Sequence, residues 1–171
     1  KNDLVSSGTY SYRFYKSTNE GNSFSLSNVG LPNSDSGRMV IDVTPANRNV
    51  VYVLSATKAY GFQGVYKSSD SGATFAQRGN TVNIFESTQA WYDMAFAVSE
   101  TNENMIFSGV LNIWRSTNGG NTFTKLNNWA VHNAAYTHAD IHFLRFFNGE
   151  LFAGTDGGFF KSTDNGGTFS D

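Results

Sequence analysis

Short apolar runs alternate with polar turns along the chain. The runs consist mostly of Val, Ile, Leu, Phe, Met and Ala, and they span residues 39–43, 50–54, 94–98, 105–107, 141–146 and 151–153. Their lengths and their β-branched and aromatic residues are typical of β-strands. Polar residues 45–49 and 100–104 separate the first two pairs of runs, and Asn148-Gly149, a favoured two-residue hairpin turn, separates the third. The pattern predicts antiparallel hairpins.

An eight-residue box occurs four times along the chain, before, between and after these runs, and successive boxes begin 51, 48 and 46 residues apart. In each box an Asn or Asp can accept hydrogen bonds from backbone amides, and a glycine is expected where φ is positive. The closing phenylalanine is expected to return to the core. Each box therefore predicts a structural hairpin. The box residues are Ser17, Asn19, Gly21 and Phe24; Ser68, Asp70, Gly72 and Phe75; Ser116, Asn118, Gly120 and Phe123; and Ser162, Asp164, Gly166 and Phe169.

The box joins the third and fourth strands of a four-strand unit that recurs about every 48 residues, which predicts the blades of a β-propeller. The expected blades cover residues 1–37, 38–90, 91–137 and 138–171 of a single all-β domain. Residues 3–5 and 12–15 are expected to be the second and third strands of the first blade. About 3.6 blades do not close a ring. We therefore expect a partial propeller that is a segment of a longer chain, with two copies closing one ring as the rival arrangement.

The boxes resemble the bacterial neuraminidase repeat (BNR), or Asp-box, whose pattern is Ser-x-Asp-x-Gly-x-Thr-aromatic. Asp70 and Asp164 match the acidic position, whereas Asn19 and Asn118 replace it. The longer phrase around each box looks most like sortilin-type propellers, xyloglucan-cleaving endoglucanases and large secreted propellers of Bacteroidetes-type bacteria. The resemblance implies an extracytoplasmic protein, secreted or at the cell surface. It implies no single activity, because the box marks a fold and not a reaction.

Composition removes several classes of function. Ser, Thr, Asn and Gly make up 70 of the 171 residues, and the net charge is −2. This charge argues against binding to nucleic acid or to anionic membrane surfaces. The absence of cysteine excludes disulfides and thiolate metal sites, and no apolar run is long enough to span a membrane. No cofactor is predicted.

Candidate chemistry is expected at the starts of the innermost strands. In propellers of this type, the loops into these strands share one face with the loops joining strands two and three, opposite the boxes. The ligand-binding candidates there are Arg38, Tyr60, Trp91, Tyr92, Asp93, His138, Asp140, His142 and Asp156. The long segments 78–89 and 124–137, with Trp129 and Tyr136 in the second, are the expected sources of specificity.

Two subsets of these candidates have specific chemistry. Asp93 and Asp140 are weak candidates for an acid–base pair, since glycosidases use two carboxylates. For His138, Asp140 and His142 a metal site, a ligand contact and a structural polar network all stay open, and no metal is assigned. With only six arginines, several of them near the box face, sialidase activity is not expected.

The leading hypothesis is a non-catalytic propeller segment of a secreted or cell-surface bacterial protein that binds a glycan or a protein partner. One alternative is a glycoside hydrolase whose active site is completed by further blades, and another is a structural spacer. The open edges are expected to meet the rest of a longer propeller or other chains.

Overall fold

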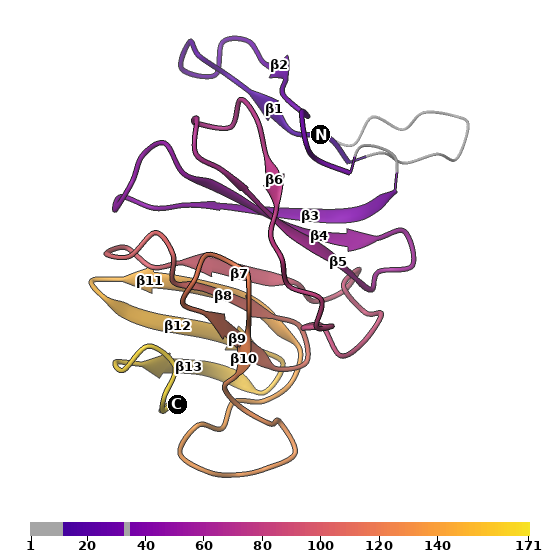
Figure 1. The fold of residues 1–171 in the computed structure, drawn as a ribbon. Coiled ribbons are helices and arrows are strands. Elements are labelled where there is room, and N and C mark those ends of the chain that lie inside the picture. Colours follow the sequence, from indigo (N-terminus) through magenta and orange to yellow (C-terminus); the bar gives the residue numbers. More distant parts are fainter. Residues whose placement is uncertain (1–11, 33–34) are drawn as a thin grey trace.

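The computed structural model describes residues 12–32 and 35–171, which form thirteen strands in four antiparallel sheets. No helix occurs within these two ranges, so none there could cross a membrane. Figure 1 shows the four sheets following one another from the indigo N-terminal end to the yellow C-terminal end. The sheets do not close into a ring. The predicted all-β partial propeller is therefore confirmed.

Each sheet is a meander of consecutive strands, which we call blades 1 to 4 in chain order. Blade 1 has only β1 (Tyr15–Lys16) and β2 (Ser25–Leu26), whereas blade 4 adds an isolated bridge between Lys161 and Ser170 to its three strands. Blade 2 contains β3 (Ser36–Val43), β4 (Val51–Thr57), β5 (Phe62–Ser68) and β6 (Ala76–Gln77). Blade 3 contains β7 (Ala95–Val98), β8 (Ile106–Gly109), β9 (Ile113–Ser116) and β10 (Thr124–Lys125). Blade 4 contains β11 (Ile141–Phe147), β12 (Glu150–Thr155) and β13 (Gly158–Ser162).

The strands form where the apolar runs predict them, with ends that differ by a few residues. Asn148 and Gly149 have φ values of 51° and 80°, as expected for the predicted two-residue hairpin between β11 and β12. In blade 1, β1 begins at Tyr15, the last residue of the predicted strand 12–15. The predicted strand at residues 3–5 lies outside the described residues.

The core lies between blades, because each strand presents alternate side chains to its two neighbours. In β4, Tyr52 and Leu54 pack with Phe96 of blade 3, whereas Val51 and Val53 pack on the side of blade 1. A second cluster joins blade 3 to blade 4. The innermost strands β3, β7 and β11 lie side by side, so their ends meet on one rim of the array.

Each box closes its hairpin with the same hydrogen bonds. In blade 2, Asp70 Oδ1 accepts bonds from the Ser68 hydroxyl at 2.7 Å and from the Thr74 amide at 2.9 Å. Ser68 Oγ in turn accepts the Gly72 amide at 2.8 Å. Gly72 has a φ of 81°, a conformation that a side chain would disfavour. The structural assignment of the box thus has a direct physical basis.

The closing phenylalanine packs against the blade that precedes its own box. Phe75 meets Phe14 of blade 1 edge-on, with ring centroids 5.1 Å apart, and Phe123 and Phe169 pack into the next two inter-blade clusters. Phe24 is 62% exposed, so the prediction that it returns to the core is wrong. The reason is that no described blade precedes blade 1.

Candidate functional site

Six of the candidate residues gather at the rim where β7 and β11 begin. Because the strands are antiparallel, the β12–β13 turn reaches the same rim and the boxes lie at the other end. We call this cluster the rim site. It contains Trp91, Tyr92, Asp93, Asp140, His142 and Asp156, together with Gln89, which links two of them.

Two carboxylates of the rim site share one amide group. Gln89 Nε2 donates to Asp93 Oδ2 at 3.0 Å and to Asp140 Oδ1 at 2.5 Å. The two accepting oxygens therefore lie no more than about 5.5 Å apart, the sum of these lengths. This upper limit is compatible with the separation of about 5–5.5 Å between the two carboxyl groups of retaining glycosidases and excludes the wider separation of inverting ones for these two oxygens.

Asp93 is fully buried, and its Oδ1 has no hydrogen-bond partner among the described residues. Burial raises the pKa of Asp93, the hydrogen bond from Gln89 opposes this rise, and the nearby Asp140 carboxylate adds to it. Asp140 itself has a φ of 61°, which is uncommon for a residue with a side chain. The pair thus combines an uncommon backbone conformation with a buried acid.

A second, more exposed network adjoins this pair. His142 Nε2 donates to Asp156 Oδ1 at 2.6 Å, and the Tyr92 hydroxyl donates to Asp156 Oδ2 at 3.0 Å. The hydrogen bond from His142 lowers the pKa of Asp156, whereas the bond to Asp156 raises the pKa of Tyr92. The Tyr92 and His142 rings also meet edge-on, 4.7 Å apart. Solvent reaches this carboxylate, because the Asp156 side chain is 37% exposed.

An aromatic surface borders the polar network. Trp91 is 64% exposed, and its ring lies 5.6 Å from the ring of Tyr92, itself 46% exposed. Neither exposed ring is needed to fill the core. An apolar ring face next to exposed polar groups suits ligands that have both kinds of surface.

The other candidates make structural contacts. Arg38 Nη1 donates to the Ala90 carbonyl at 2.9 Å, and Tyr60 is half-buried against the core between blades 2 and 3. His138 Nδ1 faces the Ala139 carbonyl at 3.1 Å.

The chain around the predicted His-Asp-His set is not a regular strand. Asp140 has a positive φ, and the β11–β12 register shifts between Ile141 and Phe143, so simple period-two alternation does not continue through His138, Asp140 and His142. No group of three such residues suited to a metal occurs in the described part of the chain.

Two residues at this end of the molecule have no recognisable sequence signal. Gln89 lies in segment 78–89, but nothing in its neighbourhood indicates that it bridges two carboxylates. Glu86, in the same segment, accepts hydrogen bonds from the side chains of Asn112, Trp114 and Lys125. Glu86 thereby ties segment 78–89, which carries Gln89 of the rim site, to the strands and turns of blade 3.

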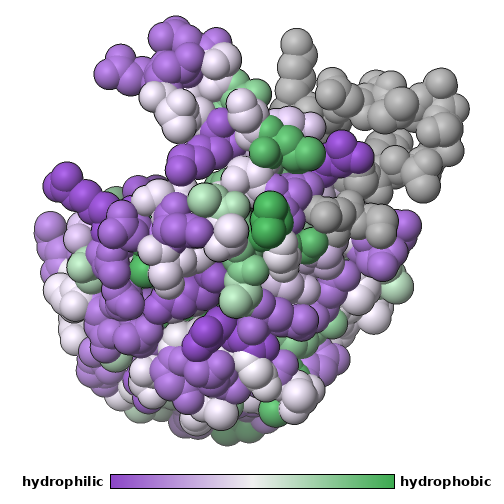
Figure 2. Space-filling model, turned by 45° about the horizontal axis from the view of Figure 1, so that its top comes forward, coloured by the Kyte–Doolittle hydropathy of each residue, from purple (hydrophilic) through white to green (hydrophobic). Residues whose placement is uncertain are grey.

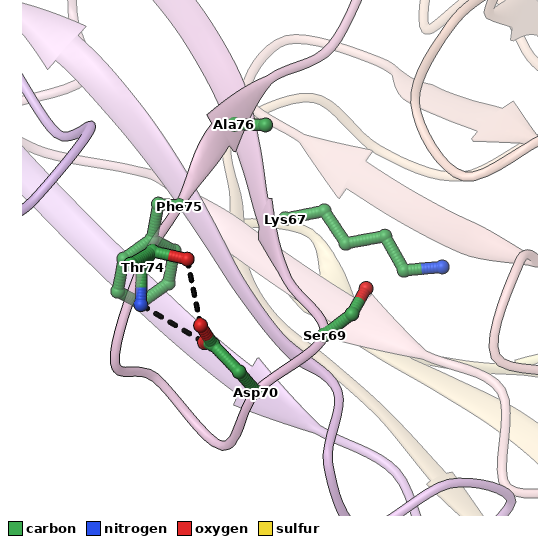
Figure 3. A pocket seen from close by; sticks show the side chains of 6 residues that line it. All are labelled: Lys67, Ser69, Asp70, Thr74, Phe75 and Ala76. Carbon is green, nitrogen blue, oxygen red and sulfur yellow. Dashed lines mark hydrogen bonds between the residues drawn. The ribbon is translucent and has the colours of Figure 1, made fainter.

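A hollow on the box side is a weaker candidate. Figure 3 shows its lining, in which Asp70 turns toward Thr74 and Lys67 extends alongside. Asp70 already accepts bonds from Ser68 and Thr74, and Lys67 Nζ lies 3.2 Å from Glu103 Oε1. Because both charged groups are already paired inside the chain, a ligand in this hollow would have to displace those contacts to reach them.

Solved structures with the same blade pattern extend these observations. No protein-family model and no curated protein matches the chain. The Niastella koreensis GH74 enzyme is 26% identical over 77% of this chain and 22% of its own, with a TM-score of 0.54. The Xanthomonas campestris GH74 xyloglucanase is 16% identical over 91% of this chain and 26% of its own, with a TM-score of 0.65. YCF48 bound to a D1 peptide is 12% identical over 83% of this chain and 42% of its own, with a TM-score of 0.54.

These three structures share a β-propeller fold with BNR-type repeats, as the boxes predict. The chain spans only about a fifth to two fifths of their lengths. It is thus an unclosed array of β-propeller blades with BNR-type Asp boxes, similar to those of GH74 xyloglucanases and YCF48.

Proposed function

We propose that the rim site binds a glycan without cleaving it, in a protein that is secreted or displayed on a bacterial surface. The observation that supports this most is the exposed Trp91–Tyr92 surface beside the exposed Asp156 carboxylate. A sugar ring has an apolar face that stacks on aromatic rings and hydroxyls that donate to carboxylates. The likeness to GH74 enzymes favours a polysaccharide as the ligand.

Burial of Asp93 favours binding over catalysis. A glycosidase requires one carboxyl group to protonate the leaving oxygen and the other to attack or to activate water. Asp93 has no exposed surface, and Gln89 occupies the position between Asp93 and Asp140. In this arrangement the pair holds the rim together, and the exposed rings of Trp91 and Tyr92 and the exposed part of Asp156 remain accessible to a ligand.

The test is a titration of the chain with xyloglucan and other β-glucan oligosaccharides by calorimetry. Trp91→Ala should weaken binding at least about tenfold, which corresponds to about 1.4 kcal/mol. Phe24→Ala is the matched control, since Phe24 is 62% exposed but belongs to a box, at the opposite end of the strands from the rim site. Its affinity should match the unmodified chain. Equal losses in both variants, or no binding to any glycan tested, would contradict the proposal.

A second candidate is a glycoside hydrolase whose site further blades complete. The observation that favours it is the spacing of the Asp93 and Asp140 oxygens, no more than about 5.5 Å. The same oligosaccharides, incubated with the chain and assayed for new reducing ends, separate the two functions. If the unmodified chain produces new reducing ends and the Asp140→Asn variant does not, the chain is a hydrolase. If the oligosaccharides bind but no new reducing ends form, the proposed function is supported.

A further inference from the structure

Asn-Gly pairs occur three times in this chain, beginning at Asn118, Asn148 and Asn165. Asparagine is a thermolabile residue, and a following glycine has no side chain to obstruct its reaction. In that reaction the glycine nitrogen bonds to the carbonyl carbon of the Asn side chain, ammonia leaves, and a succinimide ring closes. Water then opens the ring to aspartate or to isoaspartate. The glycine nitrogen must first lose its proton, so a hydrogen bond that holds this N–H opposes the reaction.

Two of the three pairs lie inside boxes, where the fold holds the glycine nitrogen. In blade 3, the Gly119 amide donates to the Asn104 carbonyl at 2.8 Å. The Asn118 side chain is held as well, because it accepts the Thr122 amide at 3.0 Å and donates to the Thr122 hydroxyl at 2.9 Å. In blade 4, the buried Gly166 amide donates to the box serine at 2.8 Å. Neither glycine nitrogen is free to react while its blade is folded.

The remaining pair, Asn148-Gly149, forms the tip of the β11–β12 hairpin and belongs to no box. The Gly149 amide donates to Glu100 Oε2 at 2.9 Å. Glu100 lies in the turn between β7 and β8, and this turn lies beside the hairpin tip (Figure 1). The contact joins blades 3 and 4, both of which the structure describes, so it does not depend on what borders the array.

The Asn148 side chain is better placed to react than the Asn118 side chain. Asn148 is exposed, and within the described residues its side chain makes no bond like those between Asn118 and Thr122. Hydrophilic side chains make up much of the surface in Figure 2, so water, the second reactant, has access to exposed turns. The hydrogen bond to Glu100 is therefore the contact that restrains the nucleophile of this pair.

We propose that Asn148-Gly149 is a site of spontaneous covalent modification, and that Glu100 restrains the reaction by accepting the Gly149 N–H. A carboxylate acceptor makes a charge-assisted hydrogen bond, which is stronger than a neutral one. Its negative charge also opposes loss of the amide proton. The inference does not depend on the rim site, which lies at the other end of β11 and β12.

The modification would act on the hairpin that aligns two strands of blade 4. Across the turn, Phe147 pairs with Glu150, and the turn sets this register. Isoaspartate adds a carbon atom to the backbone between these residues and would disturb the pairing. Aspartate keeps the backbone but places a second carboxylate near Glu100. The restraint by Glu100 thus preserves the register of β11 and β12 over time.

The test is to age the whole chain in mildly alkaline buffer and to follow each Asn-Gly pair by peptide mapping and mass spectrometry. Asn148 should react more slowly in the folded chain than in the chain unfolded in urea. In the folded chain, Glu100→Ala should accelerate the reaction of Asn148 at least about tenfold, as expected for the loss of a hydrogen bond to a charged group. Asn118 should react at an unchanged rate. Glu100→Gln keeps an oxygen acceptor without the charge and should give an intermediate rate.

Glu103→Ala is the matched control, because Glu103 lies in the same turn but contacts Lys67 and Asn47 of blade 2. Its Asn148 should react like that of the unmodified chain. The proposal is overturned by an unchanged rate in Glu100→Ala, by an equal acceleration in Glu103→Ala, or by an Asn148 that reacts as fast folded as unfolded. Circular dichroism checks that each variant is folded. If Glu100→Ala is unfolded, Glu100→Gln and Glu103→Gln provide the same comparison.

Discussion

At the scale of the residue, the box explains why Asp and Asn interchange at its third position. In the Asp form, Asp70 Oδ2 accepts the Thr74 hydroxyl at 2.7 Å. In the Asn form, Asn118 Nδ2 donates to Thr122 Oγ1 at 2.9 Å. The threonine hydroxyl can donate or accept, so it reverses its role and the hairpin keeps its shape. What distinguishes the two forms is charge.

The two Asp boxes should therefore make stability depend on pH in acid. Hydrogen bonds from Thr74 lower the pKa of Asp70, and bonds led by the Thr168 amide lower the pKa of Asp164 to about 2. Because both pKa values lie below the ordinary value in the unfolded chain, this contribution is complete above about pH 4 and is lost as the pH falls toward 2. Between about pH 4 and pH 2, the melting temperature of the Asp70→Asn/Asp164→Asn variant should therefore fall less than that of the unmodified chain.

The reciprocal change provides the check. Asn118→Asp adds a third titrating box, so its melting temperature, followed by circular dichroism, should fall more steeply with acid than that of the unmodified chain. Identical acid profiles for all three proteins would show that the charge of the box does not contribute to stability.

At the scale of the element, local pattern predicts strands and hairpins but not contacts between loops. Runs such as 50–54 and 94–98 determine the strands through the side chains they bury, and the box determines its own hairpin through contacts within eight residues. Gln89 reaches Asp140 across 51 positions, and no period in the sequence encodes that approach. The gathering of Asp93 and Asp140 follows from blade alignment, whereas their role stays a prediction.

A substitution at Glu86 tests whether its hydrogen bonds attach segment 78–89, which carries Gln89, to blade 3. Burial alone would raise the pKa of Glu86, but hydrogen bonds from Lys125, Asn112 and Trp114 lower it overall. Glu86→Ala leaves these donors unpaired and should reduce the free energy of unfolding by about 1–2 kcal/mol. Chemical denaturation measures this change.

Glu150→Ala is the matched control for the loss of a surface carboxylate. Glu150 has an ion pair with Lys161 at 3.2 Å, and both side chains are more than a third exposed. A pair of this kind contributes roughly 0–1 kcal/mol. Equal effects of the two substitutions would mean that Glu86 does not anchor the segment.

At the scale of the whole molecule, stability is expected to rise from the first blade toward the middle of the array. Blades 2 and 3 each pack against a neighbour on both faces, and their central strands β4 and β8 include side chains with no exposure. Blade 1 contributes two strands of two residues each, and both residues of β2 are exposed. A sheet with so little buried area opens at low free energy.

Hydrogen exchange followed by mass spectrometry should therefore resolve a gradient along the array. Backbone amides of β1 and β2 should exchange by local opening, at least about a hundredfold faster than those of β4 and β8, which require the inter-blade clusters to separate. The unmodified chain at low concentration is the appropriate sample, since association of its open sheet edges would protect blade 1. Protection of β1 equal to that of β4 in this sample would show that the described blades open as one unit. A gradient would show that the first blade depends on a neighbour for its stability, as its uncovered Phe24 and Tyr15 indicate.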